Sequence, residues 1–329
     1  MKLARRAPEG GPPLAGLIHL MVVYVVWGST YLAIRIAVRE GSGFPPFTMA
    51  AMRVAVAGCV LLGWAALRGS SIRLKPGELA LLAVTGVLLW VGGNGMVVWA
   101  EQRADSGYAA LIVGSMPIWV TLMEAALDRR PPSALLAGSL VVGFTGLGLL
   151  TWPVIQAGSR ADHLGVAALL LAPITWGAGS IVLRRRPLDL PPAVLSGYHQ
   201  LFGALGLGIC MMLTREPVPL PTAAAWGAWA YLVLAGSILA FTSFVSALRL
   251  LPISITMTYA YVNPVIAVFL GWIVLRESIT PWTIAGTALV LIGVAGAFRD
   301  RFGHPRKNGV PQPTEPSEDG AGVLPPVRG

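Results

Sequence analysis

The sequence contains little charge for its length. Asp, Glu, Lys and Arg make up 12% of the 329 residues, and 55% of the residues are hydrophobic. A soluble domain of this size is about one-quarter charged. The apolar residues form runs of about 20, the length of a helix that crosses a lipid bilayer. The chain is therefore predicted to be an all-α integral membrane protein, with the lipid bilayer as its surroundings.

Cysteine and histidine are also scarce, with two and four residues respectively. Cys59 and Cys210 lie inside apolar runs, so no disulfide framework or CxxC metal site is indicated. The histidines are dispersed, and no HExxH, P-loop or GxGxxG pattern occurs. Hydrolysis in a bilayer needs a metal, a carboxylate pair or a serine with a base. We therefore expect no enzyme, no cofactor and no metal. The net charge of +9 comes without a basic helix or an RNA-binding motif, so no nucleic acid is expected.

Breaks at proline, glycine and charged clusters divide the apolar sequence into ten predicted helices. Ser133 and Thr280 can cap a helix start, and Pro281 suits a first helical position. The loops are short, so the helices must pack beside one another without an inserted soluble domain. The ten predicted ranges are 16–38, 46–67, 78–100, 106–127, 134–152, 164–184, 192–213, 224–248, 254–275 and 281–298.

The basic residues orient these helices. With the N-terminus in the cytoplasm, seventeen of the 24 Lys and Arg fall on the cytoplasmic side. Arg39, Arg103, Arg160, Arg215 and Arg276 fall outside, and Arg35 and Arg53 lie within helices. Cytoplasmic loops of membrane proteins are enriched in Lys and Arg. The distribution therefore supports ten helices with both termini in the cytoplasm.

The two ends of the chain are predicted to lie outside the bundle. Residues 1–15 form a basic N-terminal cytoplasmic segment, and the apolar run after it continues without a convincing signal-peptide cleavage site. Residues 303–329 contain six prolines and few large apolar groups. Such a segment cannot bury enough surface to fold, so we expect a disordered cytoplasmic tail.

Four dipeptides recur in the same order along the chain. Trp27-Gly28 returns as Trp176-Gly177, Pro45-Pro46 as Pro191-Pro192, Met116-Pro117 as Asn263-Pro264 and Ala137-Gly138 as Ala285-Gly286, at separations of 149, 146, 147 and 148 residues. This near-constant spacing indicates two five-helix repeats, 16–152 and 164–298. Five is odd, so the second copy enters the membrane from the opposite side. Inverted repeats of this kind are typical of secondary transporters.

Four segments carry a family resemblance: WGSTYLAIRIAV, PPFTMAAMRVAVAG, GGNGMVVWAEQ and RESITPWTIAGTALVLIGV. They resemble the EamA family of the drug/metabolite transporter superfamily, in particular its bacterial inner-membrane exporters. The likeness covers roughly residues 17 to 298. It implies ten helices, cytoplasmic termini, and export of amino acids, related metabolites or drugs. DRRPPS at 128–133 departs from the Gly-Glu-Arg pattern usual at that position in the family.

Polar and aromatic side chains at membrane depth point to a central cavity between the first, third, fourth, sixth, eighth and ninth helices. Pro117 and Pro264 are expected near mid-depth, where a freed carbonyl must be satisfied by protein, water or a ligand. Aromatic groups with a few amides and hydroxyls are the usual lining of a small-molecule site. Helix packing, a simple kink and interhelical hydrogen bonds remain alternatives. The residues predicted to line the cavity are Trp27, Tyr31, Trp90, Asn94, Ser115, Trp119, Trp176, Tyr259 and Asn263.

Four ionisable residues raise separate hypotheses. Arg35 shares a helix face with Trp27 and Tyr31, and it either pairs with Glu101 in an outer gate or meets a substrate carboxylate. Structural anchoring is the alternative. Arg53 lies deeper and needs a partner more urgently. His199 is a weaker candidate for a proton site, because a lone histidine is more often packed and hydrogen-bonded.

These observations predict a transporter of a small-molecule substrate in the bacterial inner membrane. The preferred substrates are amino acids or related metabolites, exported by alternating access. A lipophilic-cation exporter is one alternative, and a non-transporting receptor or structural subunit is another. The sequence leaves open the substrate, the coupling ion, and whether two copies form a homodimer.

Overall fold

The computed structural model describes residues 12–102, 109, 112–156, 163–275 and 280–302, and within these ranges it contains helices and no strand. Seven helical stretches in this part are long and apolar enough to cross a membrane. The expected N-terminal segment and tail lie largely outside the described residues. In chain order the helices are α1 (Leu14–Val38), α2 (Pro46–Leu67), α3 (Pro76–Gly86), η1 (Val87–Gly95), α4 (Met96–Ala100), α6 (Met116–Asp128), α7 (Ala134–Gln156), α8 (His163–Arg185), α9 (Pro192–Leu213), α10 (Ala223–Tyr231), η2 (Leu232–Ala240), α11 (Phe241–Leu250), α12 (Ile253–Thr256), α13 (Tyr259–Leu275) and α14 (Pro281–Phe302).

Helix starts follow the local chemistry of the sequence. α2 and α9 begin at Pro46 and Pro192, where the missing backbone N–H costs nothing. The two predicted caps are confirmed. The Ser133 hydroxyl accepts a hydrogen bond from Leu136 N at 3.0 Å, and that of Thr280 accepts one from Thr283 N at 3.2 Å.

Two predicted helices are wrong in detail. The expected helix 106–127 is broken, because a turn at residues 114–115 precedes α6. Pro117 therefore lies in the first turn of α6 and removes no hydrogen bond from a continuous helix. The expected helix 254–275 divides into α12 and α13, with a turn at 257–258 between them. Pro264 does lie inside α13, as predicted.

Two stretches wind as π-helix, a feature that the sequence analysis did not predict. η1 and η2 have nine residues each and begin 145 residues apart, close to the spacing of the repeated dipeptides. η1 continues α3 into α4, and η2 continues α10 into α11, so each lies inside one membrane-length unit. π-Helical turns are rare and are frequent at functional sites.

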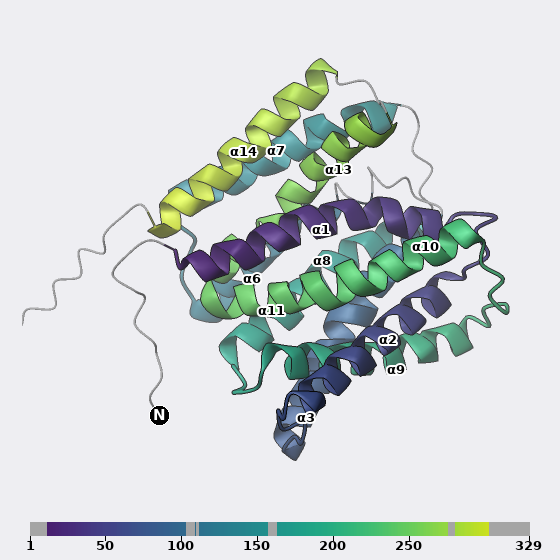
Figure 1. The fold of residues 1–329 in the computed structure, drawn as a ribbon. Coiled ribbons are helices and arrows are strands. Elements are labelled where there is room, and N and C mark those ends of the chain that lie inside the picture. The colour runs from purple at the N-terminus through teal and green to yellow at the C-terminus, as the bar shows by residue number, and fades with distance from the viewer. Residues whose placement is uncertain (1–11, 103–108, 110–111, 157–162, 276–279, 303–329) are drawn as a thin grey trace, which may run out of the picture.

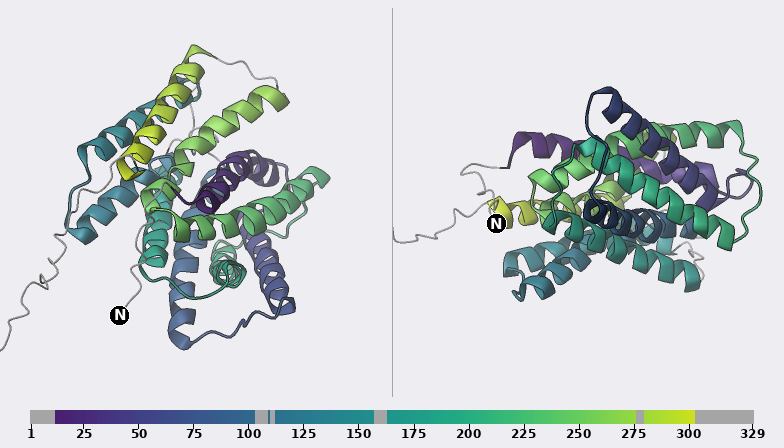
Figure 2. Two further views of the ribbon diagram at one scale, coloured as in Figure 1. Left: turned by 60° about the vertical axis from the view of Figure 1, so that its left-hand side comes forward. Right: turned by 90° about the horizontal axis from the view of Figure 1, so that it is seen from below.

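Helices at corresponding positions of the two predicted repeats have corresponding packing partners. α1 packs against α10, η2, α11 and α13, while α8 packs against η1, α4 and α6. α2 packs along α9, and α7 packs along α14, with α13 between the α7–α14 pair and α1 (Figures 1 and 2). The start of α1 and the end of α14 lie at the same end of the bundle (Figure 1).

Both pairs of corresponding helices run antiparallel. Glu216, just after α9, accepts hydrogen bonds from Phe47 N and Thr48 N at the start of α2. Tyr198, near the start of α9, donates to the Ile72 carbonyl beyond the end of α2 at 2.8 Å. In the second pair, Ser133 before α7 bonds Asp300 near the end of α14.

α7 and α14 approach closely through glycine. A Cβ on Gly293 would lie 2.7 Å from the Cα of Gly143 and 2.7 Å from the Ser139 carbonyl oxygen. The small residues Ser139, Gly143 and Gly293 therefore allow the backbones of the two helices to approach closely. Gly208 of α9, by contrast, has open space where a Cβ would lie.

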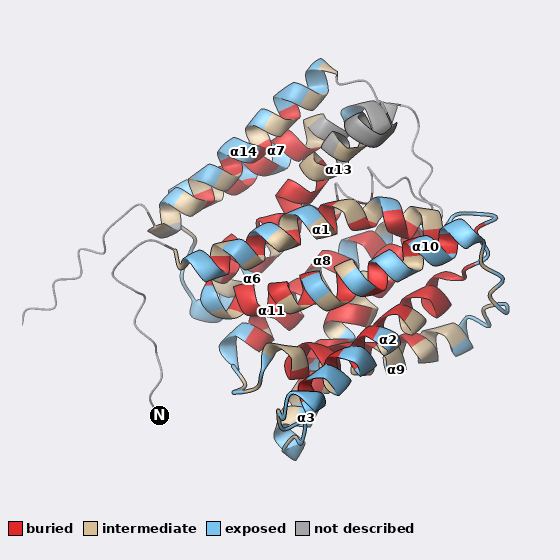
Figure 3. Cartoon of the chain, viewed as in Figure 1, coloured by how far each residue is buried: buried red, intermediate tan, exposed pale blue. Residues whose placement is uncertain are grey.

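The outer faces of the bundle are apolar. Along α1, Ile18, Met21 and Val25 are at least half exposed, while Leu20, Val23 and Trp27 on the opposite side are buried. Figure 3 shows the same division, with buried residues facing the centre of the bundle. An exposed apolar surface of this extent is suited to lipid.

One pair of loops is joined across the bundle. We name it the loop junction; it consists of residues 39–45 and 214–222. Leu220 N donates to Gly43 O at 2.9 Å, and Thr222 N donates to Ser42 O at 3.0 Å. The carboxylate of Glu216 adds bonds from Phe47 N (2.9 Å), Thr48 N (2.7 Å) and Thr48 Oγ1 (2.7 Å).

Candidate binding cavity

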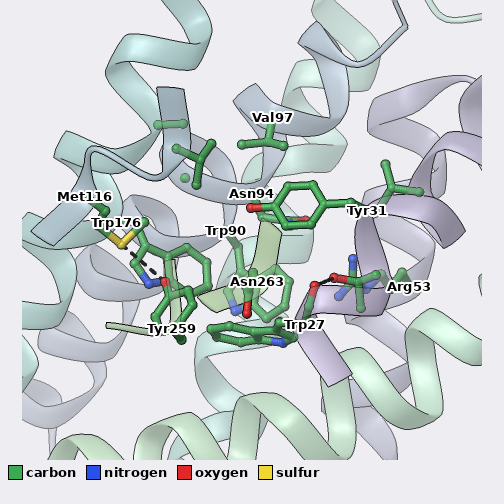
Figure 4. Close-up of a pocket in the computed structure, with 15 residues that line it drawn as sticks. Trp27, Tyr31, Arg53, Trp90, Asn94, Val97, Met116, Trp176, Tyr259 and Asn263 are labelled. Carbon is green, nitrogen blue, oxygen red and sulfur yellow. Dashed lines mark hydrogen bonds between the residues drawn. The ribbon is translucent and has the colours of Figure 1, made fainter. Parts of the chain in front are cut away.

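A cavity lies where α1, α2, η1, α4, α6, α8 and α13 meet (Figure 4). Its empty space is about 590 Å³, counted between the lining atoms and including space open to solvent. Seven of the nine residues predicted for the site line it: Trp27, Tyr31, Trp90, Asn94, Trp176, Tyr259 and Asn263. The remaining lining residues are Thr30, Ile34, Arg53, Gly93, Val97, Val113, Met116 and Ala172.

Aromatic rings form the wall of the cavity. The Trp27 ring lies 5.4 Å from that of Trp176 and 5.0 Å from that of Tyr259, both edge to face. Trp90 meets Trp176 edge to face at 6.2 Å. Trp27 and Trp176 are the two copies of the repeated Trp-Gly dipeptide, so corresponding residues of the two halves meet at the cavity.

Glycine makes room for these indoles. A Cβ on Gly93 would lie 2.6 Å from the Trp176 ring, and one on Gly203 would lie 2.4 Å from Trp90 Cβ. Any larger residue at either position would displace a tryptophan of the wall. Gly203 belongs to α9, which does not line the cavity itself, so it acts by positioning Trp90.

Several polar atoms at the cavity have no hydrogen-bond partner among the described residues. They are the indole Nε1 atoms of Trp90 and Trp176, the amide Oδ1 of Asn94 and the Nη1 of Arg53. Trp27 differs, because its Nε1 donates to the Gly236 carbonyl at 3.0 Å. A buried polar group without a partner costs about 1–3 kcal/mol. Such groups facing one cavity are suited to a polar ligand.

Arg53 contributes the positive charge of this lining. It is 2% exposed, and its Nε donates to Ser237 Oγ of η2 at 2.7 Å. Its Cζ lies 5.6 Å from the centre of the Trp90 ring. No other charged residue is present among the described lining residues. The sequence analysis predicted that Arg53 lies deep in the membrane and needs an interaction partner, but it did not include Arg53 among the residues that line the cavity.

Tyr259 and Asn263 close the cavity on the α13 side. The Tyr259 hydroxyl donates to Met116 Sδ of α6 at 3.2 Å. The Asn263 amide satisfies its neighbours when its nitrogen donates to Tyr259 O at 3.0 Å and to Tyr24 O at 3.3 Å. Asn263 therefore bonds its own helix and α1, as the helix-packing alternative predicts.

Ser115 and Trp119 are absent from the lining residues. Ser115 is the residue before α6, and its hydroxyl donates to Ile112 O at 2.5 Å. Trp119 Nε1 donates to Ser115 Oγ at 3.1 Å. The prediction placed both residues on the face of a continuous helix 106–127, which the turn at residues 114–115 interrupts.

Arg35 and Glu101 lie near one another beside the cavity. The charge of Arg35 acts on the Glu101 carboxyl, and that carboxyl acts in turn on Tyr31. Glu101 is 1% exposed, and its oxygens accept no hydrogen bond from a described residue. Neither residue lines the cavity. The charge pair of Arg35 with Glu101 and its role in an outer gate therefore stay predictions.

Membrane-length helices around an aromatic-lined cavity define a multi-pass membrane protein. The model of the EamA-like transporter family matches the chain twice, at residues 14–152 and 163–299. The chain therefore belongs to the EamA-like transporter family.

Individual relatives agree with this assignment. The chain is 35% identical over 264 residues to "Uncharacterized inner membrane transporter YedA" of Escherichia coli K12, covering 79% of this chain and 82% of the relative. It is 21% identical to "Uncharacterized transporter YoaV" of Bacillus subtilis, over 84% and 94% of the two chains. A crystal structure of another protein shares the fold with a TM-score of 0.71 at 20% identity, covering 86% of this chain and 96% of that one. The relatives identify a multi-pass inner-membrane transporter.

Proposed function

We propose that the protein is a secondary transporter that exports amino acids or related small metabolites by alternating access at the central cavity. Its ten predicted helices form two inverted halves, residues 16–152 and 164–298. The observation that carries the proposal is the contact of Trp27 with Trp176. Corresponding residues of two halves meet at a shared site only if that site lies at the interface of the halves, which is where transporters of this design bind substrate.

Inversion is supported by the packing of corresponding helices. α2 runs antiparallel to α9, and α7 runs antiparallel to α14, as inverted copies require. Arg53 and His199 provide a further match, because they are 146 residues apart, the same spacing as Pro46 and Pro192. Each is buried and bonds a hydroxyl of another helix: Arg53 bonds Ser237, and His199 Nε2 lies 2.8 Å from Thr85 Oγ1.

The loop junction supports a conformation closed to the periplasm. We place the termini in the cytoplasm from the distribution of Lys and Arg, so loops 39–45 and 214–222 lie on the periplasmic side. The corresponding loops at the other end are 68–75 and 186–191. Between these two, both fully described, no backbone hydrogen bond is formed. Of these two corresponding loop pairs, the pair that we place on the periplasmic side is the one joined by backbone hydrogen bonds.

Counterflow into proteoliposomes tests the proposal. Vesicles loaded with an unlabelled amino acid should accumulate the same labelled compound, and Trp27→Ala should abolish accumulation while the folded protein elutes normally from a sizing column. Lipophilic cations tested in parallel address the multidrug alternative. Failure to exchange any amino acid, metabolite or cation in the panel would refute transport and favour the alternative of a non-transporting receptor or structural subunit.

A further inference from the structure

The surroundings of Arg53 are unusual for a charged residue inside a membrane protein. Its guanidinium is buried, and no carboxylate of the described residues lies within salt-bridge distance. Removing the counter-ion from a buried charge is strongly destabilising in proteins, so an uncompensated charge needs a reason. Ionisable residues inside the membrane commonly mark the path of a substrate or ion.

One nitrogen of the guanidinium is fixed by a hydrogen bond, and another is buried without a partner among the described residues. Nε is held by Ser237 Oγ at 2.7 Å, which sets the orientation of the planar group. Nη1 has no partner among the described residues. Gly236 leaves room for the other terminal nitrogen, since a Cβ there would lie 2.9 Å from Nη2. The two Nη atoms form a fork that matches the two oxygens of a carboxylate.

The rest of the cavity lining combines hydrogen-bond donors with apolar groups (Figure 4). The indole N–H groups of Trp90 and Trp176 add two unpaired donors to that of Arg53. The rings of Trp27 and Tyr259, with Val113 and Met116, provide apolar walls. A ligand that satisfies this lining has hydrogen-bond acceptors together with an apolar body.

We propose that Arg53 binds the carboxylate of the substrate, and that the transporter selects small organic acids with one carboxylate and an apolar body. An ammonium group is tolerated and is not required, so hydrophobic amino acids and the corresponding carboxylic acids both qualify. Amines without a carboxylate are excluded by the positive charge of Arg53. This inference rests on the proposed transport function for its physiological meaning, and it concerns binding at the same cavity.

A set of four compounds with the same phenyl group tests this selectivity. 3-Phenylpropionate carries only the carboxylate, phenylalanine carries both charges, phenethylamine carries only the ammonium, and 3-phenylpropanol carries neither. Binding to the purified full-length protein in detergent is followed by tryptophan fluorescence. We expect the two carboxylates to bind about 10-fold to 100-fold more tightly than the amine and the alcohol, as a hydrogen-bonded charge provides.

Variants assign the preference to Arg53. Arg53→Gln should weaken binding of both carboxylates about 10-fold to 100-fold and leave the alcohol unchanged. Arg53→Lys keeps the charge without the fork and should recover part of the affinity. Arg68→Gln is the matched control, because Arg68 follows the same helix and also lies over an indole, 4.4 Å from the Trp64 ring, away from the cavity.

Three results would overturn the inference. The first is a folded Arg53→Gln protein that keeps its affinity for the carboxylates. The second is equal binding of all four compounds, or an equal response to sodium phosphate at the same ionic strength. The third is no response to either carboxylate at about 10 mM, well above the dissociation constant of a weak specific complex. Carboxylate-selective binding without counterflow would instead refute transport and leave the assignment of Arg53 intact.

Discussion

The loop junction allows the strongest prediction about conformational change. Glu216, in the second half of the chain, receives three hydrogen bonds from the start of α2 in the first half. Its charge also lies at a helix N-terminus, where a carboxylate is favoured. Glu216→Ala removes all of these interactions at once, while the remaining loop bonds between Gly43 and Leu220 and between Ser42 and Thr222 use only backbone atoms.

The size of the effect follows from the geometry. Hydrogen bonds to a charged group contribute about 1.5–3 kcal/mol each when buried. Glu216 is only partly buried, and water replaces its bonds when the junction opens. We therefore expect a total loss of about 2 kcal/mol, near the upper end measured for helix caps. This corresponds to about a 30-fold rise in the ratio of periplasm-open to periplasm-closed protein.

The assay measures access to the cavity from outside. Val97→Cys places a thiol in the lining, in a background where Cys59 and Cys210 are replaced by serine. A membrane-impermeant thiol reagent added to right-side-out vesicles should label this cysteine about 10-fold to 30-fold faster when Glu216→Ala is present. Glu40→Ala, which removes an exposed carboxylate from the facing loop, is the matched control. Equal labelling rates in the three proteins would refute the idea that the junction holds the periplasmic side closed.

Three further predictions concern stability in detergent, followed by thermal unfolding. Trp27→Ala should lower the free energy of unfolding by about 3 kcal/mol, because it removes the ring contacts with Trp176 and Tyr259. Trp27→Phe keeps an aromatic ring and should lower it less, so equal unfolding midpoints for the two variants would contradict this. Gly293→Ala should cost about 1–3 kcal/mol, since its Cβ would meet the backbone of Gly143 at 2.7 Å. Gly138→Ala, where nothing lies within 4 Å, should be neutral or slightly stabilising, and a loss there as large as at Gly293 would show that packing is not the cause. Thr222→Ala should cost about 1 kcal/mol, because the hydroxyl of Thr222 caps α10 by accepting from Ala225 N, and Thr222→Ser should restore it.

Much of this architecture could be predicted from the sequence, because its signals are local. Apolar runs mark the helices, and Ser133 and Thr280 mark two of the starts. Trp27 and Trp176 could be assigned to one cavity because the repeat made them equivalent. The break before α6 could not be predicted in the same way. The apolar run continues across Gly114 and Ser115, so the sequence predicts a continuous helix there, whereas the structure has a turn, and Ser115 and Trp119 are not among the lining residues.

Arg53 shows a different limit of sequence reasoning. Its depth could be predicted from its position in α2, but its orientation depends on Ser237 and Gly236, nearly two hundred residues away in the chain. The π-helical winding of η2 places both residues opposite α2, and residue preferences do not distinguish a π turn from an α turn. The depth of a buried polar side chain can therefore be predicted from the sequence, but its hydrogen-bond partner is known only from the three-dimensional structure.

The contact of Trp27 with Trp176 breaks the symmetry that the sequence repeat suggests. In an edge-to-face pair one ring presents its edge and the other its face, so two equivalent residues in this arrangement cannot play equal parts. The hydrogen bonds of the two indoles also differ. The Nε1 atom of Trp27 donates to Gly236 O, while the Nε1 atom of Trp176 has no partner among the described residues. The residue that corresponds to Gly236 at the π-helix spacing of 145 is Val91 of η1. If the two halves exchange conformations as proposed, we expect the Trp176 indole to donate to the Val91 carbonyl and the Trp27 indole to lose its bond to Gly236. The hydrogen bonds of these two indoles would then differ between the two orientations of the cavity.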